Sequence, residues 1–319
     1  MLAGQIFGVG DLRLVDIPEP SLDGKENAII FQPEVGCLCG SDVPYFRDTQ
    51  PKYPLEPGLS LHEMVGRVVA STTTRHSVGD KVLVVPVGQV GLFQRYVVDE
   101  ARAVPLDLRR PAEEMLLSQP LGTAIYAAKK LPPLIDLDVA IVGQGPMGLF
   151  WTALCRNLGA RNIIALDRVP ERLKVSLVMG ATHTVHVDER DPVQAVSDIT
   201  GGQLADVVIE AVGHGEQALN LCARLCRRMG RILYFGVPPE VIESIDWREL
   251  FIRNITVHTS VNPDFTRDFP LAMRWIGEGR IDVRPLVTHS YPLERIADAY
   301  RLFAERRDGA IKVEIEFPA

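Results

Sequence analysis

Two cysteines separated by a single residue, Cys37 and Cys39, stand directly before a Gly-Ser-Asp turn in residues 35–42. The spacing is too short for an ordinary disulfide, and it differs from the two-residue gap that is common in structural zinc sites. A metal site, a redox pair and simple packing are therefore all open interpretations of this pair. The rest of the chain must decide between them.

A histidine and a glutamate, His62 and Glu63, follow downstream and directly precede an apolar run. Thiolate, imidazole and carboxylate are good zinc ligands, and a catalytic zinc keeps three protein ligands with one position left for water or substrate. Cys39, His62 and Glu63 meet that count. Taken alone, a cysteine and a His-Glu pair are commonplace, so these candidate ligands need support from other parts of the chain.

Three glycines, Gly143, Gly145 and Gly148, have G-x-G-x-x-G spacing between an apolar strand-like run and a helical one. The first glycine of such a turn permits the tight bend, the second lets the backbone approach a pyrophosphate, and the third lets the helix pack on the strand. Free N–H groups at the helix N-terminus favour the phosphates. The turn, with Pro146 and Met147, is therefore predicted to bind a dinucleotide.

An acid, Asp167, ends the next predicted strand, where a carboxylate would bind the ribose 2′-hydroxyl of NAD and repel the 2′-phosphate of NADP. NAD is therefore the expected cofactor, and the neighbouring Arg168 leaves NADP open. The alternative is a glycine-rich turn that binds no dinucleotide. Strand, turn, helix and acid together argue against it.

The elements around these residues divide the chain into two parts. Up to about residue 120, short β-type runs separated by turn residues predict a small all-β unit. From Val139 onward, strands alternate with helices, which predicts βαβ units and a parallel sheet. A further helix, a loop and a closing strand follow after about residue 262. The sequence therefore favours an α/β protein with two domains.

Composition excludes several classes of function. With 319 residues, of which 46% are hydrophobic and 24% charged, the chain is typical of a soluble globular protein. A net charge of −7 disfavours nucleic acids and anionic membranes as partners. No signal peptide or membrane span is expected, because the apolar runs are short and broken. Five cysteines without a secretory context favour reduced thiols and a cytoplasmic location.

Motifs spread over nearly the whole chain occur in a consistent order: GCLCGSD, LHE, VGDKVLV, QPLGTAIYAA, GQGPMG, DVVIEAVG and RIDVRPLVTHSYPLERIADAY. Together they resemble the zinc-dependent medium-chain dehydrogenase/reductase family, most closely its polyol (sorbitol-type), threonine and sugar dehydrogenase branch. The resemblance implies a GroES-like β-rich catalytic domain (1–123 and 263–319) with an inserted, doubly wound Rossmann domain (124–262). It also implies a homodimer or homotetramer.

The resemblance assigns roles to individual residues. It makes Cys39, His62 and Glu63 ligands of a catalytic zinc, and Ser41 the hydroxyl that takes the substrate's proton. Gln119 stands where the family often has Glu or Cys, so its amide oxygen is a candidate ligand or a holder of the zinc's water. The remaining cofactor-binding positions are Thr123 and Met147 near the nicotinamide, Arg172 near the adenosine ribose, Lys312 at the pyrophosphate, and Val212 and Val237.

The chain departs from the family at three places. No cysteine lies between residues 40 and 154, where the family often has a four-cysteine lobe, so one zinc is expected instead of two. Pro44 replaces a histidine that often relays the proton to solvent. Leu61 replaces the usual glycine before His-Glu, and its side chain is expected to constrict the backbone near the metal.

The activity implied by the resemblance is reversible, zinc-dependent and NAD(P)-linked oxidation of a secondary alcohol (a polyol, sugar or related hydroxy compound) to its ketone. One alternative is a zinc-independent enone or quinone reductase of the same superfamily, whose members lack the Cys and His-Glu pairing. Another is a non-catalytic NAD-binding protein, for which Pro44 and Gln119 leave room. Cys37 is expected to be a packed residue, and its distance from the zinc stays open.

Overall fold

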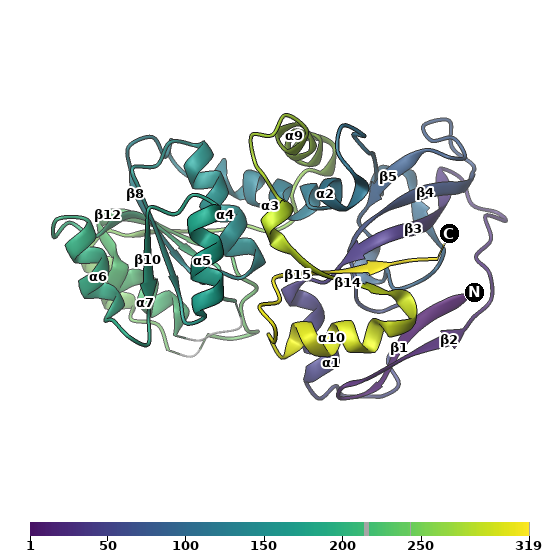
Figure 1. Cartoon of the computed structure of the whole chain (residues 1–319), viewed down its shortest axis with the longest axis horizontal. Helices are drawn as coiled ribbons and strands as arrows, with labels where there is room; N and C mark the ends of the chain where they lie inside the picture. Colours follow the sequence, from purple (N-terminus) through teal and green to yellow (C-terminus); the bar gives the residue numbers. More distant parts are fainter. Residues whose placement is uncertain (214–216, 243, 319) are drawn as a thin grey trace. The chain divides into compact units, whose positions relative to one another are not determined.

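The computed structural model describes residues 1–213, 217–242 and 244–318 (Figure 1). The chain forms two compact units. The first contains Met1–Gln119, Phe265–Gly279 and Val287–Ala319, and the second contains Pro120–Asp264 and Arg280–Leu286. The short segment Arg280–Leu286 therefore groups with the second unit, although the sequence places it in the first domain. It is held there by Asn157, which exchanges two hydrogen bonds with Arg280.

The first unit is built on a mostly antiparallel sheet with the order β14-β15-β3-β4-β5-β7, in which β6 also pairs with β3. A separate ribbon consists of β1 and β2. The strands are β1 (Leu2–Gly8), β2 (Asp11–Asp16), β3 (Ala28–Cys37), β4 (Glu63–Ser71), β5 (Lys81–Val84), β6 (Tyr96–Asp99), β7 (Ala103–Pro105), β14 (Val287–Pro292) and β15 (Lys312–Glu316).

Helices of the first unit cover this sheet, and α10 packs on β15 and contributes Tyr300 and Phe303 to the core around Phe31. They are α1 (Val43–Arg47), α2 (Ala112–Leu116), α9 (Phe265–Gly277) and α10 (Ile296–Ala304), with short 3₁₀ turns η1 (Gly40–Asp42), η2 (Val87–Gln89), η3 (Glu100–Arg102) and η5 (Leu293–Arg295). The C-terminal β15 lies beside the N-terminal β3 (Figure 1), which completes the unit from both ends of the chain.

The second unit is a parallel sheet with the order β10-β9-β8-β11-β12-β13. Because α4 contacts α5 while α6 contacts α7, the helices form two groups, as in a doubly wound fold. The elements are β8 (Asp138–Val142), α4 (Pro146–Asn157), β9 (Asn162–Asp167), α5 (Pro170–Val178), β10 (His183–His186), α6 (Pro192–Ile199), β11 (Ala205–Glu210), α7 (Ala218–Leu225), β12 (Cys226–Tyr234), α8 (Trp247–Ile252), β13 (Thr256–Thr259) and η4 (Arg284–Leu286). The predicted α/β fold class is confirmed.

Helix α3 (Ser118–Ala128) begins in the first unit and continues into the second. Across the described ranges, no helix is both long and apolar enough to span a membrane.

One predicted element boundary is wrong. The apolar periodicity around Cys222 and Cys226 predicts a helix that continues to Gly230, but α7 ends at Leu225 and β12 begins at Cys226. Cys226 pairs with Ala205 of β11, so sheet pairing overrides the helical pattern. The two cysteines therefore do not share a helical face, and the arginine-rich run beside them lies in a strand and not at a helix end.

Candidate functional site

Three predicted ligands lie together in the first unit. Cys39, His62 and Glu63 each offer one ligand atom, and these atoms are all within 4.8 Å of one another. The sheet explains this proximity, because β3 and β4 are antiparallel neighbours in which Cys37 is opposite Glu63. Cys39, just past the end of β3, thereby comes next to His62, just before β4. In the described part of the chain, no second group of at least three Cys, His, Asp or Glu side chains is arranged in this way.

The same residues leave polar atoms unsatisfied in a way that fits a cation. Among the described residues, Nδ1 of His62, Oε1 of Glu63 and Oγ of Ser41 are buried without a hydrogen-bond partner. Buried polar atoms are nearly always bonded, so each of these atoms is expected to meet a ligand, an ion or water. A thiolate, an imidazole and a carboxylate form a donor set that zinc prefers. The residues present therefore fit the metal that the sequence implies.

Asp42 holds the two ligand-bearing segments in place. Its buried carboxylate accepts the backbone N–H of Cys39 at 2.7 Å through Oδ2 and that of Leu61 at 2.8 Å through Oδ1. Oδ1 also accepts the hydroxyl of Ser60 at 2.7 Å and lies 4.0 Å from Nδ1 of His62. One carboxylate thus fixes the backbone on both sides of the ligand group, which is how outer residues orient metal ligands.

The backbone before His62 is strained. Ser60 and Leu61 have φ values of 88° and 64°, the left-handed region that favours glycine and costs other residues about 1–2 kcal/mol each. The bond from Leu61 N–H to Asp42 and the bond from Ser60 N–H to Gln89 O hold this conformation. Leu61 itself is fully buried. The glycine-to-leucine departure is therefore accommodated by local strain, without loss of the ligand geometry.

Lys312 lies elsewhere than the resemblance predicts. Its ammonium is fully buried in the first unit, where it donates to Oε2 of Glu63 and, at 3.1 Å, to the carbonyl of Leu38. A buried and paired ammonium is not presented to a cofactor phosphate, so the predicted pyrophosphate contact is corrected. Burial raises the pKa of Glu63 and Lys312 opposes that rise. Burial alone would lower the pKa of Lys312. The negative charge of Glu63 opposes this effect, and the pKa of Lys312 lies above its usual value.

Cys37 is a separate case from Cys39. It is fully buried at the end of β3 and lies outside the group of ligand atoms found in the described residues. Burial raises the pKa of its thiol well above the usual value. A protonated, inaccessible thiol is a poor ligand and a poor nucleophile. The pair therefore consists of one candidate ligand and one packed side chain.

The glycine-rich turn of the second unit has the predicted geometry. Gly143 follows β8 with φ 91°, and Gly145 caps α4 in an extended conformation. A Cβ on Gly148 would lie 1.9 Å from the carbonyl oxygen of Gly143, so no larger residue fits there. A Cβ on Gly145 would meet only Arg172 Nη1 at 3.7 Å, so this glycine borders open space. The turn is therefore shaped to bring a ligand's phosphates to the start of α4.

Asp167 ends β9 beside this turn. Its carboxylate accepts the backbone N–H of Gln144 through Oδ2 and that of Val169 at 2.9 Å through Oδ1. The neighbouring Arg168 is exposed and lies 3.6 Å from Asp188. Asp167 thus supports the glycine-rich turn as well as standing at the predicted ribose position.

The remaining predicted residues occupy three places. Pro146 and Met147 are the first residues of α4, and Arg172 lies in α5 beside Gly145. Val212 and Val237 are half-exposed apolar residues, 50% and 54%, in the segments after β11 and β12. Gln119 is buried in α3, which also contains Thr123. Their roles toward zinc and cofactor stay predictions.

Two carboxylates were missed by the sequence reasoning, Asp42 and Glu210. Each has a signal in the sequence. Asp42 closes the Gly-Ser-Asp turn after Cys39, and Glu210 is a charged residue at the end of the apolar run Val207–Ile209. Both are fully buried and accept backbone N–H groups. A buried acid whose role is to accept backbone N–H groups of other segments is difficult to recognise without the fold.

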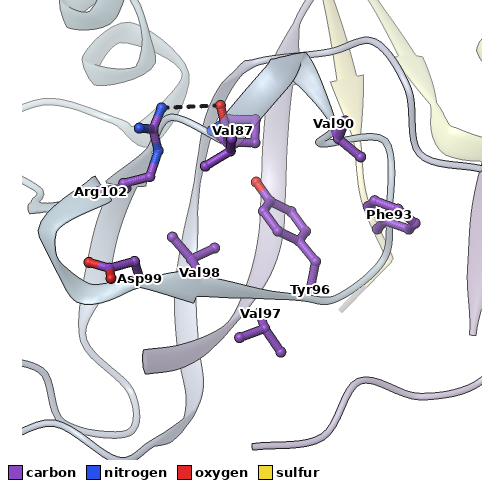
Figure 2. A pocket seen from close by; sticks show the side chains of 9 residues that line it. Val87, Val90, Phe93, Tyr96, Val97, Val98, Asp99 and Arg102 are labelled. Atoms are coloured by element: carbon purple, nitrogen blue, oxygen red, sulfur yellow. Dashed lines mark hydrogen bonds between the residues drawn. The ribbon is translucent and has the colours of Figure 1, made fainter. Parts of the chain in front are cut away.

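A separate hollow of about 240 Å³ lies in the first unit beside η2 and β6 (Figure 2). Its lining is mainly apolar, with Val87, Phe93 and Val98, and it contains neither cysteine nor histidine. Arg102 donates to the Val85 and Pro86 carbonyls, so its guanidinium is already engaged. This hollow is therefore lined by none of the three predicted ligand residues and is distinct from the ligand group.

Comparisons with known proteins agree with this geometry. Residues 146–278 match the zinc-binding dehydrogenase family. The sorbitol dehydrogenase of Bacillus subtilis (strain 168) is 27% identical, over 99% of this chain and 97% of that protein. The L-threonine 3-dehydrogenase of Bacillus velezensis is 26% identical, over 93% and 94%. The structure of the alcohol dehydrogenase TADH from Thermus sp. ATN1 has the same fold, with a TM-score of 0.89 and 24% identity over 99% of each chain.

The site and the relatives lead to one classification. A donor group suited to zinc lies in a β-rich unit, a dinucleotide turn lies in a doubly wound unit, and the likeness to sorbitol and threonine dehydrogenases extends over nearly the full length. The chain is similar over nearly its full length to zinc-dependent medium-chain dehydrogenases of the polyol and threonine dehydrogenase branch, and it is an NAD(P)-dependent alcohol dehydrogenase.

Proposed function

We propose that the protein interconverts a secondary alcohol of the polyol or sugar class and its ketone, with a single zinc held by Cys39, His62 and Glu63. The observation that carries this proposal is the mutual distance of 4.8 Å or less between the three ligand atoms. The relatives named sorbitol and threonine dehydrogenase support a polyol or sugar as the first substrate class, and an amino alcohol as the second.

The chain's own residues supply positioning and proton handling. Zinc, when bound, supplies a Lewis acid that lowers the pKa of an alcohol hydroxyl, and the nicotinamide accepts the hydride. Ser41, whose buried Oγ has no partner among the described residues, would accept the hydrogen bond of the substrate hydroxyl. As it takes that proton it would pass its own hydroxyl proton on to water or a ribose hydroxyl. Gln119 offers a neutral amide oxygen to the metal or its water. Asp42 keeps the two ligand segments in register.

The cofactor preference follows from Asp167. Its carboxylate would accept the ribose 2′-hydroxyl of NAD and repel a 2′-phosphate, and the neighbouring Arg168 is directed to Asp188. NAD is therefore proposed as the preferred cofactor. Gly143, Gly145 and Gly148 shape the pyrophosphate site at the start of α4.

A screen of polyols, sugars, amino alcohols and hydroxy acids with NAD and with NADP tests the proposed function. NAD reduction should occur with at least one polyol or sugar, should stop with a chelator, and should return with zinc. Activity on enones or quinones that resists the chelator would support the zinc-independent alternative. Cofactor binding without turnover of any alcohol would support the non-catalytic one.

A homodimer, or a tetramer built from it, is part of the same proposal. In the described residues β13 is an outer strand of its sheet, so its free edge is available for a second copy. Trp247, Phe251 and Val261 flank this strand in sequence and are exposed apolar residues. Sedimentation analysis should give a dimer or tetramer for the wild type and smaller species for Phe251→Glu. A monomeric wild type would contradict this assembly.

A further inference from the structure

A buried carboxylate at the end of β11 ties two loops of the second unit together. Glu210 is 0% exposed. Its Oε1 accepts the backbone N–H groups of Val212 and Gly213, both at 2.9 Å, and its Oε2 accepts that of Gly236 at 3.0 Å. A buried charge must be compensated, and here main-chain donors take part in that compensation.

The three N–H groups belong to two different segments. Val212 and Gly213 follow β11, whereas Gly236 follows β12, its parallel neighbour in the sheet. The segments approach closely, because a Cβ on Gly236 would lie 2.3 Å from Gly213 N and a Cβ on Gly213 would lie 3.0 Å from Val237 N. Glycine at both positions permits this contact, and the carboxylate of Glu210 joins the two backbones across it.

The tied segments also border the glycine-rich turn. A Cβ on Gly143 would lie 2.9 Å from Cγ2 of Val212, and the N–H of Ala211 donates to the carbonyl of Val142 at 2.9 Å. The carboxyl ends of β8, β11 and β12 therefore form one contiguous edge. In a doubly wound sheet, ligands bind at this edge. Two half-exposed apolar side chains stand on it, Val212 and Val237.

We propose that Glu210 is a positioning residue for the cofactor: its carboxylate fixes the segments after β11 and β12 so that Val212 and Val237 form a single apolar surface for the nicotinamide end of the dinucleotide. The inference rests on the proposed cofactor site and names a residue that acts through the backbone. It requires both carboxylate oxygens, since one serves each segment.

The variant Glu210→Gln tests whether cofactor positioning depends on the two acceptor oxygens of the carboxylate or only on the size of the side chain. Glutamine keeps the volume and one acceptor oxygen, but its amide nitrogen is a donor and opposes the N–H group of one segment. A matched control lies at the other end of the same strand. Asp206 accepts the backbone N–H of Asp138 at 2.8 Å and forms an ion pair with Arg227, so Asp206→Asn removes a similar bond far from the edge that binds the cofactor.

The experiment measures NADH and ADP-ribose binding to the purified full-length protein by calorimetry, without added zinc. Glu210→Gln should weaken NADH binding about tenfold or more and leave ADP-ribose, which lacks the nicotinamide, within about twofold. Asp206→Asn should leave both affinities within about twofold of wild type. Should Glu210→Gln not fold, Gly236→Ala separates the same segments sterically, and it should give the same selective loss.

Three other results would contradict the positioning role of Glu210, the proposed function or both. Equal losses for NADH and ADP-ribose would show a general structural role for Glu210 and overturn the positioning role. Unchanged NADH affinity in Glu210→Gln, with binding by the wild type, would also overturn it and leave the proposed function standing. A wild type that binds neither ligand would overturn the proposed function and this inference together.

Discussion

Lys312 and Glu63 form an ion pair that is buried at both ends, with 0% and 1% of the two side chains exposed, although 249 positions separate them in the sequence. The pair joins β15 to the start of β4 and leaves Oε1 of Glu63 unbonded within the described residues. Oε2 of Glu63 thus accepts a hydrogen bond from the buried ammonium, and Oε1 is the oxygen proposed to bind the metal. The C-terminal strand therefore positions Glu63, the proposed zinc ligand, directly.

Removing the ammonium should destabilise the protein strongly. Lys312→Met leaves the Glu63 carboxylate buried without its partner, and the loss of one member of a buried pair costs about 3–5 kcal/mol. The matched control is Lys81→Met, which removes an ion pair with Glu34 whose side chains are 37% and 29% exposed. The control should lose at most about 1 kcal/mol. Chemical denaturation of the metal-free proteins measures both values. Equal and small losses would contradict a structural role for the buried pair.

The two glycines of the turn should respond differently to alanine. A Cβ at position 148 collides with Gly143 O at 1.9 Å, whereas one at position 145 meets nothing closer than 3.7 Å. Gly148→Ala should therefore lower the melting temperature by several degrees, and Gly145→Ala should leave it nearly unchanged. Gly145→Ala should still weaken NADH binding about tenfold, because the methyl group occupies space beside the pyrophosphate. Full NADH affinity in Gly145→Ala would argue against the assigned phosphate site.

Replacing the acid at the end of β9 should change the cofactor preference. Asp167→Asn keeps one acceptor oxygen for the Gln144 N–H, although its amide nitrogen then faces the Val169 N–H, and it removes the charge that repels a 2′-phosphate. The ratio of kcat/KM with NAD to that with NADP should fall about tenfold or more. Asp198→Asn, an exposed acid paired with Arg190, is the control and should leave the ratio nearly unchanged. If Asp167→Asn kept the wild-type ratio, the proposed source of NAD preference would be wrong.

A buried acid in β15 should make stability depend on pH. Burial, followed by Glu113 and Glu316, raises the pKa of Glu314 to about 7, while Lys312 opposes the rise. The pKa of a glutamate in the unfolded chain is about 4.3, so the folded protein binds this proton more tightly than the unfolded chain does. Proton binding therefore contributes to the free energy of unfolding fully below about pH 4, and this contribution is lost as the pH rises to about 7. Glu314→Gln should therefore be more stable than wild type at pH 8, by about 1–2 kcal/mol, and equal to it at pH 4. The control is Glu294→Gln, because Glu294 is exposed and is not among the charges that act on Glu314. A stability difference between Glu314→Gln and wild type that does not vary with pH would exclude this assignment.

Local sequence patterns were sufficient for the parts of the fold that depend on neighbouring residues. The glycine-rich turn, with its flanking strand and helix, follows from spacing within a short segment, and Gly143 and Gly148 have the geometry expected of them. Cys39, His62 and Glu63, the predicted ligands, lie together in the fold. Their proximity depends on the pairing of β3 with β4, which the resemblance implied but composition could not.

Contacts between residues far apart in the sequence could not be predicted from local sequence patterns. The ammonium of Lys312 was expected at a phosphate and is instead held by Glu63, because strand β15 inserts beside β3 and carries it into the core. The end of α7 was misplaced for a related reason, since Cys226 takes its conformation from β11 and not from its helical neighbours. Asp42 and Glu210 act on backbone groups of other loops, which a residue pattern does not record.

The most direct test of the proposed metal centre is the zinc content of the purified protein after reconstitution with zinc. It is compared between wild type, Cys39→Ala and Cys37→Ala. The wild type and Cys37→Ala should each hold one zinc per chain and reduce NAD with a polyol or sugar. Cys39→Ala should lose the metal and at least about 10³-fold of kcat/KM, since metal-assisted ionisation of the alcohol supplies several kcal/mol. Full zinc occupancy in Cys39→Ala, or full alcohol oxidation by metal-free wild type, would contradict the proposed metal centre.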